Sequence, residues 1–199
     1  MVTFSTFVAK TTVFAVIAAF LLFIGDEDSE TTVHIHPESE VVIAGTTNVN
    51  SFDCSYILED KSDPLHVVYE TKDGKFLFSK AELFLQNSGF DCGGRGINRD
   101  FQELLKTEDH PRVLLELLYA EVPEKPSDVI RAGLRITLAG VSREFETELI
   151  CDMNPNLCIY GNFVMHLSDF DLEAPRKALG IIQVDDQVEV QLNIKLRPY

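Results

Sequence analysis

The chain has 199 residues, of which 45% are hydrophobic, so it can build one ordinary domain with a real apolar core. Its 17 Lys and Arg are outnumbered by 32 Asp and Glu, which gives a formal net charge of -15 at pH 7. This balance argues against a nucleic-acid partner, because a DNA or RNA surface needs concentrated cations to displace counterions. The normal apolar content argues against a disordered chain.

The first 25 residues differ from the rest of the chain. They contain one charged side chain, Lys10, which precedes an apolar run over residues 11–25. The run has about the length of the apolar region of a secretory signal and falls short of the roughly 18 to 20 residues that a membrane-spanning helix needs. We therefore expect residues 1–25 to be a signal peptide, or an N-terminal membrane anchor if they are not cleaved. One domain over residues 26–199 would then lie outside the cytoplasm, typically in the periplasm.

Alternation of apolar and polar residues is the main signal in the rest of the chain. It is clearest over residues 130–138 and 188–197, and weaker over residues 40–45, 52–58, 66–70, 76–79, 81–86, 113–119, 145–150 and 162–167. Successive side chains of a strand face opposite sides, so each segment has one dry and one wet face. About ten such strands favour a closed antiparallel barrel, which hides strand edges and the apolar face together, over a sandwich.

An amphipathic helix is expected between the strands. Asn98 is its expected N-cap, and Pro111 helps to end it. Its apolar stripe consists of Ile97, Phe101, Leu104 and Leu105. A short second helix is expected over residues 174–179, because Pro175 suits a first-turn position.

Four cysteines in an exported chain are most simply two disulfides. Cys151 and Cys158 flank a turn-rich hexapeptide that can bring two antiparallel strand ends together, so we predict that these two are paired. Cys54 and Cys92 would then form the second disulfide. A zinc site is the alternative, but the cysteine spacing matches no common zinc motif.

Four segments together resemble the YceI-like family of exported bacterial proteins, as a divergent branch with cysteine pairs. They are residues 98–111, residues 135–145, the Ser-Asp-Phe sequence at 168–170 and the Asp-Gln-Val-Glu-Val sequence at 186–190. The resemblance spans nearly all of residues 31–199. It implies a mainly β fold, namely a lipocalin-like antiparallel barrel of about eight strands or more with one amphipathic helix and a short second helix. It also implies an apolar tunnel that holds a polyisoprenoid or a similar lipid.

The inward apolar faces of three predicted strands are the candidate binding surface. Their residues are Leu115, Leu117, Tyr119, Leu134, Ile136, Leu138, Phe163, Met165 and Leu167. A filled barrel and a hollow one require the same inward pattern, so periodicity does not separate a lipid cavity from a solid core. The expected function is non-enzymatic binding of a long apolar lipid in the cell envelope. The alternative is a structural or protein-interaction module with a solid core.

No motif in the chain predicts catalysis. There is no Gly-x-Ser-x-Gly sequence, and the Gly-rich segment at 93–96 has the spacing of neither a P-loop nor a dinucleotide fingerprint, so a turn is expected there. His34 and His36 share a strand face and could offer two imidazoles to a metal, but nothing in the sequence indicates a third ligand. A metal-assisted enzyme is therefore the weakest hypothesis, and neither a metal nor a cofactor is expected.

Overall fold

The structure is a computed structural model that describes residues 28–58, 64–152, 157–177 and 181–198. The predicted signal or anchor over residues 1–25 lies outside these ranges. Among the described residues, every helix is too short or too polar to cross a bilayer.

Antiparallel strands make up most of the described chain. Their bounds are β1 Ser29–Ile35, β2 Ser39–Thr47, β3 Ser51–Leu58, β4 Leu65–Lys72, β5 Lys75–Lys80, β6 Glu82–Gln86, β7 Arg112–Glu121, β8 Asp128–Leu138, β9 Val141–Asp152, β10 Leu157–His166, β11 Arg176–Lys177 and β12 Ile182–Pro198. The helical elements are the α-helix α2, Arg95–Leu104, and the 3-10 helices η1, Asn87–Gly89, and η2, Leu167–Phe170.

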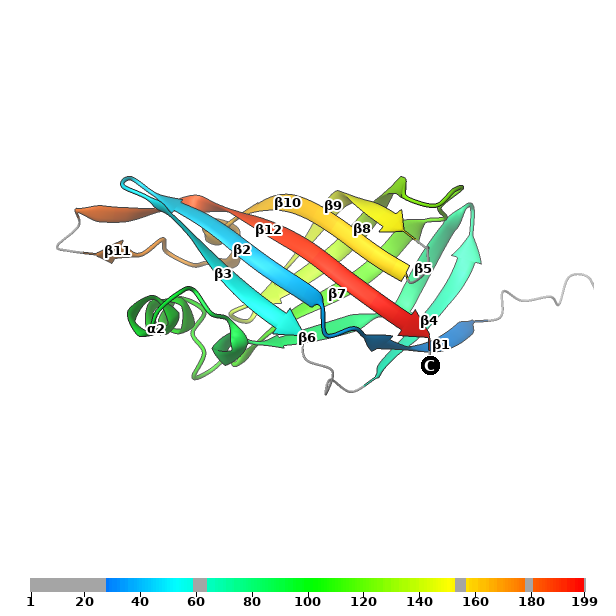
Figure 1. The fold of residues 1–199 in the computed structure, drawn as a ribbon, viewed down its shortest axis with the longest axis horizontal. Coiled ribbons are helices and arrows are strands. Elements are labelled where there is room, and N and C mark those ends of the chain that lie inside the picture. The colour runs from blue at the N-terminus through cyan, green and yellow to red at the C-terminus, as the bar shows by residue number, and fades with distance from the viewer. Residues whose placement is uncertain (1–27, 59–63, 153–156, 178–180, 199) are drawn as a thin grey trace, which may run out of the picture.

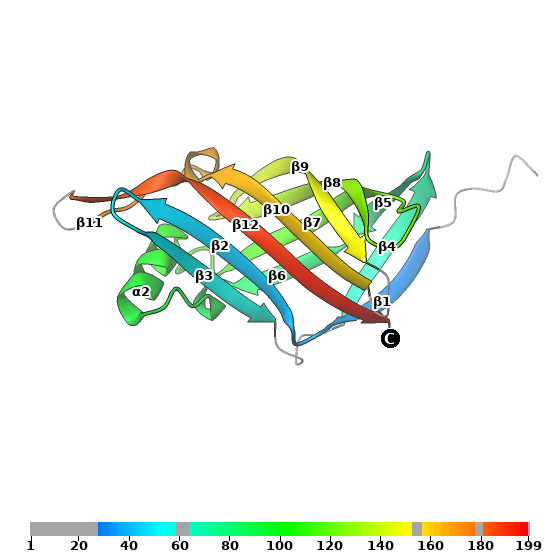
Figure 2. The same ribbon diagram turned by 45° about the horizontal axis from the view of Figure 1, so that its top comes forward.

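Eight strands pair in a closed ring. The order is β1, β4, β5, β7, β8, β9, β10 and β12, and residues 33–35 of β1 then pair with residues 196–198 of β12. The predicted mainly β, antiparallel barrel of eight strands or more is therefore confirmed. Figures 1 and 2 show β1 and β4 at one end of this barrel and α2 at the other.

The α2 end of the barrel is built differently. Here β2 pairs with β12 and with β3, while β6 pairs with the first half of β7, so β3 and β6 form two facing edges. A bridge between Ser55 and Asp91 and a disulfide between Cys54 and Cys92 connect β3 to the segment that leads into α2. The predicted Cys54–Cys92 disulfide is thus present, and it fastens the helical segment to the barrel.

The single α-helix of the described chain begins earlier than predicted. Its first residue is Arg95, and its N-cap is Gly94, which offers no capping side chain. Asn98 lies inside the helix, where its Oδ1 accepts a hydrogen bond from the Cys92 N–H at 2.7 Å and its Nδ2 donates to Asp91 Oδ1 at 3.1 Å. The prediction of Asn98 as N-cap is therefore wrong, because its amide ties the disulfide-bearing loop to the helix.

The predicted second helix over residues 174–179 is also wrong where the chain is described. Residues 176 and 177 form β11, which pairs with residues 183 and 182 of β12. The Pro175 carbonyl accepts a hydrogen bond from the Val184 N–H at 3.1 Å. Pairing with β12 satisfies the backbone groups that a helical turn would have used, and residues 178–179 lie outside the described ranges.

The core occupies the inward face of the strands. All five apolar positions predicted on β8 are buried: Ile130, Ala132, Leu134, Ile136 and Leu138. A large apolar cluster extends from the strands beneath α2 through the middle of the barrel to Ile35 of β1. A smaller, separate cluster lies between β7, β8 and β9, with buried members Ala120, Ile130, Ala132, Leu149 and Cys151. The barrel interior is therefore largely packed rather than a continuous tube.

Candidate functional site

An apolar chamber of about 250 Å³ lies inside the barrel beneath α2. Strand residues from β2, β3, β8, β10 and β12 form its walls, and they include Ile43, Phe52, Leu138, Met165 and Val188. Among the described residues of its lining, only Thr47, Asn50 and Asp100 are polar. Asn50 is exposed in the turn between β2 and β3, so the chamber opens beside this turn.

The helix α2 forms the roof of the chamber. The spacing of Ile97, Phe101 and Leu104 places them on one side of the helix, and all three line the chamber. Leu105, at the C-cap, also lines it and is only 2% exposed. The predicted amphipathic stripe is therefore the part of the site that α2 supplies.

The C-terminal side of α2 is anchored to neighbouring elements. Buried Asn87 donates hydrogen bonds from its Nδ2 to Thr107 Oγ1 at 3.1 Å and to the His110 carbonyl at 2.8 Å. The His110 ring lies against Gly140 in the β8–β9 turn, where a Cβ would be 2.6 Å from the ring. Gly140 also has a φ of +82°, so a side chain there would be both strained and obstructed. Two of the segments that carry the YceI-like resemblance thus meet in space.

The other two resembling segments also meet. The backbone N–H and the hydroxyl of Ser168, in η2, donate hydrogen bonds to Asp186 Oδ1 at 2.8 Å and Oδ2 at 2.6 Å. The hydrogen bond from the Ser168 hydroxyl is the main reason that the pKa of Asp186 is lowered. This contact fixes η2, whose Leu167 lines the chamber and whose Phe170 is fully buried.

The nine predicted lining residues separate into groups. Leu138, Met165 and Leu167 line the chamber. Leu134, Ile136 and Phe163 are buried in the large core cluster, and Leu115 and Leu117 are half-buried against it. That the three chamber residues bind a lipid stays a prediction.

The prediction that Tyr119 lines the interior is wrong, because Tyr119 lies on the outer face of the barrel. A β-bulge between Leu117 and Tyr119 shifts the β7–β8 register, so that Ala120 takes the next buried position. The Tyr119 hydroxyl donates a hydrogen bond to Glu146 Oε2 at 2.6 Å, which raises the pKa of the phenol. Its ring covers Gly133, where a Cβ would be 2.3 Å away.

The prediction of a Cys151–Cys158 disulfide is also wrong. The β9–β10 register places Cys151 opposite Ile159 and Cys158 opposite Asp152, so the two cysteines are offset by one residue. Because successive strand residues face opposite sides, their side chains point to opposite faces of the sheet. Both are free thiols; Cys151 is buried, which raises its pKa, and Cys158 is half-buried.

Several chamber residues carry no signal in the sequence that marks them as part of a site. The apolar stripe of α2 was visible as a helix face, but nothing in one sequence says which strands it covers. Ile43, Phe52 and Val188 belong to β2, β3 and β12, which only the topology brings beneath α2. The sequence places them in alternating segments but does not show that they meet at one site.

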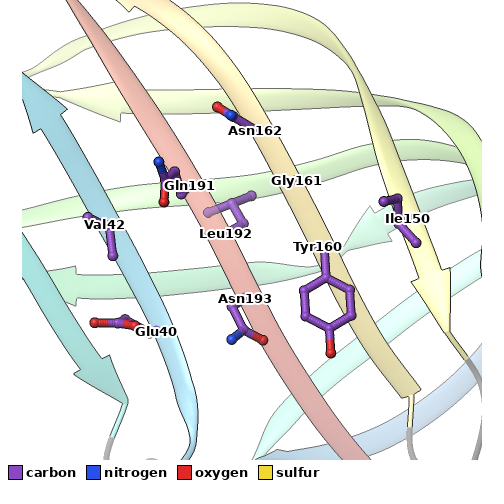
Figure 3. A pocket seen from close by; sticks show the side chains of 9 residues that line it. All are labelled: Glu40, Val42, Ile150, Tyr160, Gly161, Asn162, Gln191, Leu192 and Asn193. Atoms are coloured by element: carbon purple, nitrogen blue, oxygen red, sulfur yellow. The ribbon is translucent and has the colours of Figure 1, made fainter.

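A second, more open cavity of about 440 Å³ lies on the outer face of β2, β12, β10 and β9. Figure 3 shows Glu40, Asn193 and Tyr160 in a row across this face, as the strand register requires. Its amides Asn162 and Gln191 donate hydrogen bonds to Glu189 Oε1 at 2.6 and 3.1 Å. This second cavity is larger, but it is more exposed and its lining is mixed in polarity, so the less open, mainly apolar chamber is the better candidate site.

The chemistry of the described residues gives no metal centre. They contain no group of three or more His, Cys, Asp or Glu side chains arranged to hold an ion. His36 Nδ1 instead accepts a hydrogen bond from the Glu38 N–H at 3.2 Å.

Comparison with solved structures identifies the fold. A polyisoprenoid-binding domain from Saccharophagus degradans, implicated in plant cell wall breakdown, is similar with a TM-score of 0.62 at 10% identity, over 85% of this chain and 99% of that one. BcnA of Burkholderia cenocepacia gives a TM-score of 0.55 at 13% identity, over 79% and 95%. The YceI protein of Campylobacter jejuni gives 0.50 at 11% identity, over 67% and 81%. No protein-family model and no curated protein matches the sequence. The chain therefore adopts the fold of the YceI-like and polyisoprenoid-binding proteins.

Proposed function

We propose that this protein binds an apolar lipid in the chamber beneath α2 and that it does so without catalysing a reaction. The observation that carries the proposal is the chamber itself, whose lining among the described residues is apolar except at Thr47, Asn50 and Asp100. Such a site removes an apolar chain from water, which is worth about 0.8 kcal/mol per methylene before ordering costs.

The polar residues give the expected orientation of the ligand. Thr47 and Asn50 are joined by hydrogen bonds at the turn beside the opening, where the Thr47 hydroxyl donates to Asn50 Oδ1 at 2.8 Å. A lipid would place its tail against α2 and the strands, and its polar end beside this turn. The similarity to a polyisoprenoid-binding domain supports an isoprenoid as the tail.

The cell envelope is the proposed location. It is supported by the apolar segment at residues 11–25, which has the pattern of a signal or anchor. The Cys54–Cys92 disulfide also accords with an oxidising compartment.

Lipid extraction tests the proposal. Protein purified from its native host and extracted with organic solvent is expected to release one lipid per chain, identified by mass spectrometry. The variant Leu104→Trp should fill the chamber and abolish the lipid signal. Glu103→Trp, on the exposed side of the same helix, is the matched control and should retain it. An empty wild-type protein that also fails to take up added isoprenols would contradict the proposal.

An interaction module is the second candidate, and one observation favours it. Val129, Ile150 and Tyr160 lie next to one another on the outer faces of β8, β9 and β10, and they are 56%, 44% and 37% exposed. Crosslinking in the native host would recover a single envelope protein that Ile150→Glu no longer captures. An unchanged crosslinking pattern in that variant would remove this candidate.

A further inference from the structure

The chamber ends abruptly along the barrel axis. Met165 and Val188, which pair across β10 and β12, both line it. Phe163 and Val190 form the next inward pair on the same strands; neither lines the chamber, and they are only 8% and 5% exposed. The floor therefore lies between two successive layers of inward side chains.

Aromatic rings pack behind this floor. The ring centroids of Phe163 and Phe145 are 6.0 Å apart, and those of Phe145 and Phe170 are 6.1 Å apart. Phe170 is 0% exposed, and its 3-10 helix is held by the hydrogen bonds from Ser168 to Asp186. Packed rings in a dense interior do not yield readily to a ligand tail.

The volume of the chamber limits the length of apolar chain that it can hold. A cavity of about 150 Å³ holds benzene, which corresponds to about 25 Å³ per carbon. On this scale the chamber volume of about 250 Å³ accommodates about ten carbons, for example two isoprene units. A longer chain has to leave its remainder outside the opening.

We propose that Phe163, backed by Phe145 and Phe170, determines ligand specificity by limiting the inserted apolar chain to about ten carbons. This inference rests on the proposed lipid-binding function. Phe163 acts by position: it fills the layer behind Met165 and Val188, and so it prevents the chamber from extending further along the barrel.

A homologous series of straight-chain 1-alkanols, from hexanol to tetradecanol, tests the limit by calorimetric titration of the delipidated full chain. Affinity should rise about fourfold per methylene up to decanol, as expected for full burial, and then level off. A continued fourfold rise to tetradecanol would overturn the length limit and leave lipid binding intact. Failure of every alkanol to bind would instead overturn the proposed function, and the limit with it.

Two variants should move the plateau in opposite directions. Phe163→Ala vacates a ring below the floor, and its plateau should lie about four carbons further along the series, since such sites partly collapse. Met165→Phe adds bulk above the floor, and its plateau should come about two carbons earlier. Phe78→Ala, which removes a ring packed against the smaller cluster, is the control and should leave the plateau at decanol. If Phe163→Ala does not fold, an unshifted plateau in Met165→Phe still overturns the proposal.

Discussion

The two ends of the barrel are closed by different means. At the β1 end, β1 joins β4 to β12 by backbone pairing, which brings strands to about 4.8 Å. At the α2 end, a disulfide and a helix cover the space between β3 and β6. A helix with its side chains is about 10 to 12 Å across, so it covers a wide gap without filling it. The chamber therefore lies where the wall of the barrel changes from strand to helix.

The burial of aromatic side chains also differs between regions of the barrel. In the large core cluster, Phe90 and Phe170 are 3% and 0% exposed. Toward the β1 end, Tyr69, Phe76 and Phe78 contact one another but are only half-buried. An aromatic ring of the large core cluster should therefore contribute more to stability than one of these half-buried rings.

Truncation of one aromatic ring in the large core cluster and one near the β1 end should give the largest difference in stability. Phe170→Ala should lower the free energy of unfolding by about 4 kcal/mol, because it leaves a cavity in a fully buried site. Phe78→Ala should cost about 1 to 2 kcal/mol, because its ring is already half-exposed. Urea denaturation of both variants measures the difference, and equal losses would contradict the comparison.

Removal of the disulfide should act on the α2 end alone. The double variant Cys54→Ser, Cys92→Ser loses a crosslink across a sequence separation of 38, which is worth about 4 kcal/mol. Hydrogen exchange should show lost protection in α2 and β3 with little change in β1 and β4. Uniform loss of protection would mean that the two ends do not open independently.

Asp186 offers a smaller, pH-dependent test. Its pKa is lowered in the folded protein by Ser168, so its contribution is present above the unfolded value of about 4 and is lost as the pH falls through the folded value. Asp186→Asn should destabilise the protein by about 1 kcal/mol at pH 7, a figure kept small because the carboxylate is partly solvated. The difference from wild type should shrink below pH 4 in denaturation curves, and a difference that is constant with pH would exclude this linkage.

The smallest expected effect lies at the bulge in β7. Tyr119→Phe removes the hydrogen bond to Glu146 on the solvated outer face and should cost about 0.5 kcal/mol. Affinity for the alkanol series should not change, since Tyr119 faces away from the interior. A changed affinity would restore Tyr119 as a lining residue.

The period-two pattern of the sequence was sufficient to predict the barrel and the inward face of β8. It could not predict the side of Tyr119, because a bulge inserts one residue and reverses every later position without any change in composition. For the same reason the sequence could not predict that Cys151 and Cys158 stay unpaired, because an offset of one residue decides which face of the sheet a thiol occupies.

The site itself was less predictable than the fold. The roof residues were recognisable as an apolar helix stripe, but their position over Met165 and Val188 depends on long-range topology. Whether the interior is hollow depends on how rings such as Phe163 and Phe170 pack, and alternation alone carries no information about volume.

The last described strand also has a consequence for biosynthesis. β12 pairs with β1 at one end and with β2 at the other, and Ser39 Oγ bonds to the Lys195 backbone across 156 residues. Neither the β12–β1 nor the β12–β2 pairing can form until β12 has left the ribosome, because synthesis proceeds from the N-terminus. A nascent or prematurely terminated chain that lacks residues 182–198 therefore exposes the unpaired edges of β10 and β2, which invite aggregation and degradation.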